Sequence, residues 1–82
     1  MDFTKFVYYK KLFSSYADVV DLVTFRKMLG GISEKAALSL VQENHVKHFY
    51  IGQQYLIPKL YVIEYVMSQH YEEYRKCLKV SV

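Results

Sequence analysis

The sequence feature that most constrains the fold is the stretch HFYIGQQYLIPK, residues 48–59. Two runs of aromatic and β-branched residues flank Gly52, a pattern that is typical of a β-hairpin. Pro58, the only proline of the chain, ends the second run because its nitrogen has no hydrogen to donate to a neighbouring strand. A hairpin is therefore expected within 45–58, in a chain whose other segments favour helices.

The loop of this hairpin can be assigned from the alternation of side chains along its strands. A three-residue loop, 52–54, places four apolar residues on one face: Phe49, Ile51, Tyr55 and Ile57. A two-residue turn would instead pair Ile51 with Gln54 and separate those apolar side chains. We therefore predict the three-residue loop, with two uncharged glutamines, Gln53 and Gln54, near its tip.

Four helices are expected around the hairpin, because apolar residues recur at helical spacing. Their predicted ranges are 3–15, 22–29, 34–43 and 59–78. Good N-caps and left-handed terminators delimit the middle two: Asp21, Gly30-Gly31, Ser33 and Asn44. The segment 21–43 thus has the outline of a helix-turn-helix. On these residues alone, a helical hairpin used only for packing fits the pattern equally well.

Length and composition narrow the class of protein. The 82 residues are expected to form one domain, 1–82, and an apolar fraction of 52% is enough for a single core. Charges interrupt the apolar runs well before the ~18 residues of a membrane span, and no signal-peptide pattern is visible. Cys77 is the only cysteine, which excludes an internal disulfide. We therefore expect a soluble, cytoplasmic protein without a membrane partner.

Residues 20–66 resemble the excisionase-type winged-helix domain, a small relative of MerR-like DNA-binding domains found on bacterial phages, transposons and integrative elements. The pieces that carry the likeness are MLGGIS (28–33), EKAALSLV (34–41), HVKHFYIG (45–52), YLIPK (55–59) and VIEYV (62–66). The hairpin and the last piece are the specific part. The order of the predicted elements agrees with this: a mainly α fold with a small β-hairpin, namely a winged helix-turn-helix with an added N-terminal helix and a long C-terminal helix.

The resemblance also implies sequence-specific binding of double-stranded DNA, with helix 34–43 in the major groove and the hairpin on the backbone or minor groove. Members of this family steer an integrase toward excision, which implies an integrase partner and cooperative self-association on DNA. The residues expected at the DNA are Ser33, Lys35, Ser39, Lys47, Gln53, Gln54, Tyr55 and Lys59. Of these, Lys35 and Ser39 are expected in the groove, and Lys47 and Lys59 at phosphates.

Several positions depart from the family pattern. Arginine or lysine is usual early in the recognition helix and at the hairpin tip, where this chain has Glu34, Ala36 and the two glutamines. Each missing cation removes a phosphate contact, so weak binding with a shallow salt dependence is expected. The alternatives are a small transcriptional regulator, or a winged-helix module that binds protein through the C-terminal helix or through an aromatic N-terminal helix containing Phe3, Phe6, Tyr9 and Phe13.

The sequence contains no arrangement of residues that is typical of catalysis, so we do not expect an enzyme. His45 and His48 have HxxH spacing, but on a strand this spacing directs the two side chains to opposite faces. Adding His70 and Cys77 gives no known spacing of zinc ligands. Neither a metal, a cofactor nor a small-molecule ligand is therefore expected.

Overall fold

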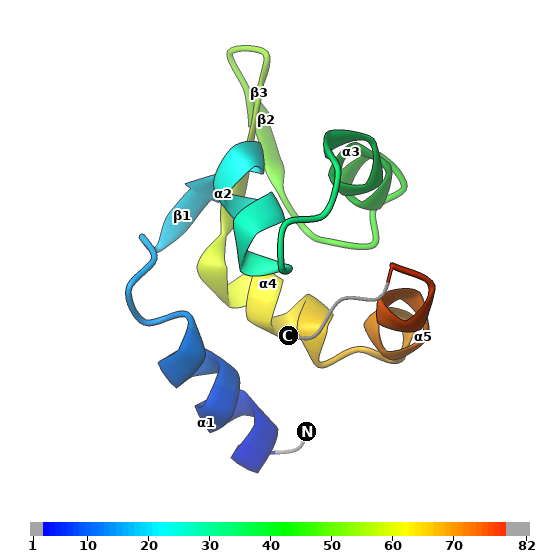
Figure 1. The fold of residues 1–82 in the computed structure, drawn as a ribbon. Coiled ribbons are helices and arrows are strands. Elements are labelled where there is room, and N and C mark those ends of the chain that lie inside the picture. Colours follow the sequence, from blue (N-terminus) through cyan, green and yellow to red (C-terminus); the bar gives the residue numbers. More distant parts are fainter. Residues whose placement is uncertain (1–2, 79–82) are drawn as a thin grey trace.

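A computed structural model describes residues 3–78 of the chain. Its elements follow in the order α1 (Phe3–Leu12), β1 (Val19–Asp21), α2 (Leu22–Met28), α3 (Glu34–Gln42), β2 (Phe49–Ile51), β3 (Gln54–Pro58), α4 (Lys59–Val66) and α5 (Gln69–Leu78) (Figure 1). The fold is mainly helical, with a small antiparallel sheet of three strands in the order β1-β3-β2. None of the described helices is long and apolar enough to cross a membrane.

Side-chain caps set the beginnings of α2 and α3, as the sequence predicts. The Asp21 carboxylate accepts a hydrogen bond from the Thr24 N–H at 2.8 Å, and the Ser33 hydroxyl accepts one from the Ala36 N–H at 3.1 Å. These bonds satisfy backbone donors that the first turn of a helix leaves free. The bond from Thr24 also holds the pKa of Asp21 below its usual value, so this cap remains charged further into acid.

The ends of α2 and α3 are set by residues with a left-handed backbone, which confirms the predicted terminators. Gly30 has a φ of 85° and Asn44 a φ of 61°. The N–H groups of Gly31 and His45 donate to the carbonyls of Arg26 and Leu40, at 2.8 and 2.9 Å. These are the long backbone bonds of a Schellman motif, which close a helix and turn the chain.

The core lies between one face of the sheet and the helices packed against it. β1, a strand that the sequence pattern alone does not assign, pairs with β3 so that Val20 lies opposite Ile57, and both side chains are buried. α2 packs on α3, β1 and β3, while α4 packs on β3. Phe25 of α2 and Leu40 of α3 are almost fully buried in this core.

The predicted three-residue loop of the hairpin is wrong. Ile51 pairs with Gln54, and the turn consists of Gly52 and Gln53, with φ values of 59° and 63°. Positive φ at both central residues is typical of a type I′ turn, whose twist matches that of the paired strands. The apolar residues need not share a buried face, because the hairpin projects beyond the body of the molecule (Figure 1) and Phe49 is exposed.

The C-terminal helix, predicted as one element over 59–78, is two helices. Ser68 lies between α4 and α5. Its hydroxyl donates to the carbonyl of Tyr65 at 2.6 Å and accepts a hydrogen bond from the Tyr71 N–H at 3.3 Å. One side chain therefore closes α4 and caps α5, because serine competes for backbone hydrogen bonds that would otherwise continue a helix.

α1 packs on α4 and ends at Leu12, short of the predicted residue 15. Of the four aromatic residues that a free N-terminal helix would expose, Tyr9 and Phe13 are buried and Phe6 is partly buried against the core. Phe3 remains 73% exposed. Most of this aromatic set therefore contributes to the core.

Tyr71 provides a test of the packing between α5 and the core. Its side chain is 1% exposed, and its hydroxyl has no hydrogen-bond partner within residues 3–78. Burial raises the pKa of Tyr71 from 10.0 to about 12, because the buried phenolate would lose its hydration. The unfolded chain therefore releases this proton at lower pH than the folded chain does, and stability falls as pH rises from 10 toward 12.

We expect Tyr71→Phe to leave stability at neutral pH unchanged or raise it by about 1 kcal/mol, because it removes an unsatisfied buried hydroxyl. The variant should also lose less stability than the wild type as pH rises above 10. Urea unfolding at neutral and alkaline pH measures both effects, with the exposed Tyr8→Phe as control. A loss of stability at neutral pH would mean that the hydroxyl has a partner.

Candidate nucleic-acid interface

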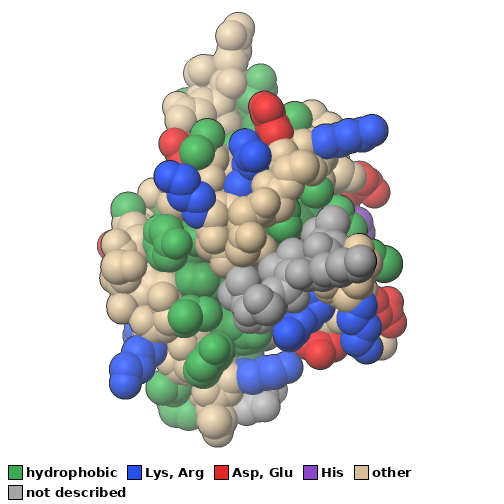
Figure 2. All heavy atoms as spheres, viewed as in Figure 1, with side chains coloured by type: hydrophobic (Ala, Val, Ile, Leu, Met, Phe, Trp, Pro, Cys, Tyr) green, Lys and Arg blue, Asp and Glu red, His purple; other side chains and the backbone are tan. Residues whose placement is uncertain are grey.

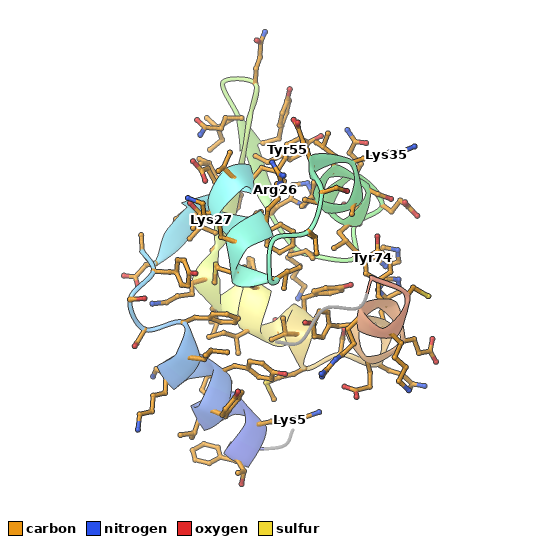
Figure 3. The ribbon with its side chains drawn as sticks, in the orientation of Figure 1. Lys5, Arg26, Lys27, Lys35, Tyr55 and Tyr74 are labelled. Atoms are coloured by element: carbon orange, nitrogen blue, oxygen red, sulfur yellow. The ribbon has the colours of Figure 1, made fainter. Side chains whose placement is uncertain are left out.

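One face of the molecule brings together the last turn of α2, the first turn of α3 and the hairpin. Arg26 and Lys27 come from α2, Lys35 from α3 and Tyr55 from β3 (Figure 3). We call the surface of these four residues the α2–α3 face. Figure 2 shows basic side chains spread across this part of the molecule, with acidic side chains among them. The hairpin projects from its upper edge (Figure 1).

Arg26 holds the turn between the two helices. Its Nε donates a hydrogen bond to the carbonyl of Ile32 at 2.9 Å, across the glycine turn. A guanidinium has five N–H donors. Within the part of the chain that the structure describes, the other four donors of Arg26 make no hydrogen bond or ion pair. The same side chain can therefore brace the turn and bind an anion.

Lys27 and Lys35 are the exposed cations of the α2–α3 face. Neither forms an ion pair with a residue in the range 3–78. No ion pair has to be broken before either lysine meets a phosphate, so both side chains are suited to that contact, although Lys27 also interacts at longer range with the Asp21 carboxylate.

The structure brings together four of the eight residues that the sequence predicts at DNA. Lys35 and Tyr55 lie on the α2–α3 face, and Gln53 and Gln54 lie at the exposed tip of the neighbouring hairpin. The other four predicted residues have partners elsewhere in the protein: Ser33, Ser39, Lys47 and Lys59.

The two serines of α3 use their hydroxyls within the helix. The Ser33 hydroxyl is the N-cap described above, and the Ser39 hydroxyl donates to the Glu43 carboxylate one turn further on. The Ser39 hydroxyl cannot donate to a phosphate or a base without first losing its bond to Glu43. The Ser33 hydroxyl is only an acceptor in its cap, so its own hydrogen can still be donated.

The structure does not bring Lys47 or Lys59 to the α2–α3 face. The Nζ of Lys59 donates to the Tyr16 carbonyl at 3.0 Å, and its side chain is only 17% exposed. Lys59 thereby ties the start of α4 to the segment before β1. The Nζ of Lys47 lies 3.4 Å from a Glu64 carboxylate oxygen and 5.6 Å from the centre of the Tyr61 ring, both on α4.

The sequence reasoning missed Arg26 and Lys27, because it treated the first helix of the pair mainly as a brace for the turn. The sequence does contain a signal that could have indicated them. Two consecutive basic residues occupy the last turn of α2, where cations are stabilised by the helix dipole. The glycine turn follows them after Met28 and Leu29, and the bond from Arg26 to the Ile32 carbonyl holds the end of α2 close to the segment that leads into α3.

Tyr55 links the hairpin to α3. Its hydroxyl accepts a hydrogen bond from the Gln42 side-chain amide at 3.3 Å. Its ring lies 4.7 Å from the ring of Tyr50 and 5.4 Å from that of His48, measured between centroids. The middle of the hairpin is thus held to the C-terminal end of α3, while the turn beyond it remains exposed.

The exposed side of α3 carries a shallow groove of about 440 Å³. The residues that line it are Glu34, Lys35, Leu38, Ser39, Gln42 and Glu43. With two glutamates and one lysine, this groove offers a polyanion little long-range attraction. Positive charge on this side of the molecule therefore depends on α2 as well as on α3.

The histidines of the chain do not form a metal site in the described residues, where no three metal-ligating side chains come together. His45 stacks on His70, with ring centroids 3.8 Å apart, and Nδ1 of His48 lies 2.8 Å from the Val46 carbonyl.

In comparisons with known proteins, no family model, no curated protein and no solved structure matches this chain.

Proposed function

We propose that α2, α3 and the hairpin form a winged helix-turn-helix that binds double-stranded DNA. In this arrangement α3 enters the major groove, and the hairpin lies along the neighbouring minor groove or backbone. The order of elements supports the assignment: β1, two helices around a glycine turn, then a hairpin whose second strand pairs with β1.

The observation that carries the proposal is the α2–α3 face itself. Arg26, Lys27 and Lys35 come from the two helices that a helix-turn-helix places against DNA, and the hairpin projects beside them (Figure 3). Phosphate contacts of this kind position a protein on the duplex, while base contacts supply specificity.

Three cations set an expected strength and salt dependence. If each neutralises one phosphate, the logarithm of the binding constant falls with the logarithm of salt concentration with a slope of about −3. This is a shallow dependence, and a single copy therefore binds weakly at physiological salt.

As the family resemblance implies, we propose that the protein acts as an accessory factor in recombination. Several copies and an integrase would then share one DNA segment.

An NMR titration of ¹⁵N-labelled protein with a generic duplex tests the proposal, because it detects weak binding and locates it. We expect the amide signals of Lys27, Lys35, Gln53 and Gln54 to shift together at low salt, and the shifts to fade toward physiological salt. Shifts confined to α1 or α5, or no shift at low salt, would overturn the proposal.

A second candidate function is supported by α1, which lies at the opposite end of the molecule from the hairpin (Figure 1). Its exposed apolar residues are Phe3 (73%), Val7 (48%), Tyr8 (56%) and Leu12 (44%). Lys10 and Lys11 lie in its last turn. Exposed apolar surface of this kind marks a protein-binding site. If the DNA titration shows no shift, a protein-interaction module that takes an acidic, apolar partner becomes the preferred function.

A further inference from the structure

The hairpin has an unusual surface for an element beside a DNA-binding face. Residues 48–58 contain no aspartate, glutamate, lysine or arginine. Three large apolar side chains are exposed on β2: Phe49 (54%), Tyr50 (59%) and Ile51 (62%). Next to the turn, Ile51 pairs directly with Gln54, so an apolar side chain and an amide lie on the same face of the hairpin tip.

Such a surface is poorly suited to the phosphate backbone, since it supplies no cation to replace the counterions of DNA. It is better suited to the floor of a groove. The minor groove is about 6 Å wide and presents adenine N3 and thymine O2 as acceptors, and guanine adds a 2-amino donor. Amide N–H groups match those acceptors. Apolar side chains, isoleucine among them, are known to enter base steps from this groove and to kink the duplex.

We propose that the hairpin is a minor-groove wedge: its tip enters the minor groove of A·T-rich DNA, and the Ile51 side chain inserts at a base step. The amides of Gln53 and Gln54 donate to adenine N3 and thymine O2 beside it. The proposal rests on the DNA-binding function above and names the DNA that this function prefers. Guanine opposes the wedge because its 2-amino group occupies the groove floor.

Three duplexes of equal length test the groove assignment: one of A·T pairs, one of G·C pairs and one of inosine·cytosine pairs. Inosine is guanine without the 2-amino group, so its pair with cytosine resembles A·T in the minor groove and G·C in the major groove. At low salt we expect inosine·cytosine DNA to bind as tightly as A·T DNA, and about tenfold more tightly than G·C DNA.

Each other outcome of this comparison has a distinct meaning. If inosine·cytosine DNA binds like G·C DNA, the minor-groove wedge is overturned, while DNA binding itself stands. If none of the three duplexes binds, the proposed function fails and the wedge fails with it.

The role of Ile51 is tested by the bend of a duplex labelled with fluorophores at both ends. We expect Ile51→Ser to abolish the bend and to weaken A·T binding about tenfold, and Ile51→Met to preserve both, because methionine can also act as a wedge. The matched control is Leu60→Ser, which removes an equally exposed apolar side chain from α4. If the Ile51→Ser variant bends the duplex as much as the wild type does, the wedge is overturned. All three substitutions are at exposed positions, so folding is preserved.

Discussion

Reversing the charges of Lys27 and Lys35 together is expected to abolish DNA binding at physiological salt. Each lysine is exposed and forms no ion pair within residues 3–78. Loss of one phosphate contact should weaken binding about tenfold and reduce the salt slope by about 1. Glutamate adds repulsion to that loss. Fluorescence anisotropy with a labelled duplex at several salt concentrations measures both quantities.

The matched control for this experiment is the double variant Lys11→Glu, Lys76→Glu. It changes the net charge by the same amount, but both lysines lie outside the α2–α3 face, on α1 and α5. Binding should remain within about threefold of the wild type, because only the long-range field changes. Equal losses in the two double variants would indicate that overall charge, rather than this face, attracts DNA.

Replacing Phe25 with alanine is expected to cause the largest loss of stability. The side chain is fully buried (0% exposed) at the centre of α2, the helix that packs on α3 and on the sheet. Burial of this kind makes a phenylalanine-to-alanine change cost about 3–5 kcal/mol, part of it from the cavity that remains. Since small domains are stable by about 5–15 kcal/mol, much of the protein's stability would be lost.

Urea unfolding followed by circular dichroism checks this expectation. Phe3→Ala is the control, because Phe3 is 73% exposed and its removal should change stability by less than about 0.5 kcal/mol. If the two variants are equally stable, α2 does not pack on α3 and the sheet as described. The face that carries Arg26 and Lys27 would then have to be reconsidered as well.

Features set by local chemistry could be predicted from the sequence. The caps at Asp21 and Ser33 and the terminators at Gly30 and Asn44 depend only on neighbouring backbone groups, and the structure confirms all four. Pro58 ends a strand and precedes a helix, also as predicted. These signals are sufficient to delimit α2 and α3 and to place the end of the hairpin.

Features that depend on where a segment lies in space could not be predicted in the same way. The three-residue loop was inferred on the assumption that the apolar residues of both strands are buried. The structure leaves Phe49 and Ile51 outside the core, so burial does not select their register and the turn residues do. The break at Ser68 was missed because serine is compatible with both a helix interior and a cap.

The candidate site shows the same limit for charged residues. A lysine in a sequence is a donor whose partner is unknown, since a carboxylate, a backbone carbonyl and a phosphate all suit it. Lys59 donates to a carbonyl and Lys47 pairs with Glu64, whereas Lys35 has no such partner in the described residues. Only the packing of α4 against the rest of the chain separates these cases.

The projection of the hairpin has a consequence for how the sequence of such a protein can evolve. The side chains of β2 and of the turn are exposed, whereas β3 is attached to the body of the molecule through its pairing with β1 and the bond from Gln42 to Tyr55. Substitutions at exposed positions usually alter stability by less than about 0.5 kcal/mol. Selection can therefore vary the tip of the hairpin almost independently of the fold, so new binding preferences can arise without compensating changes in the core.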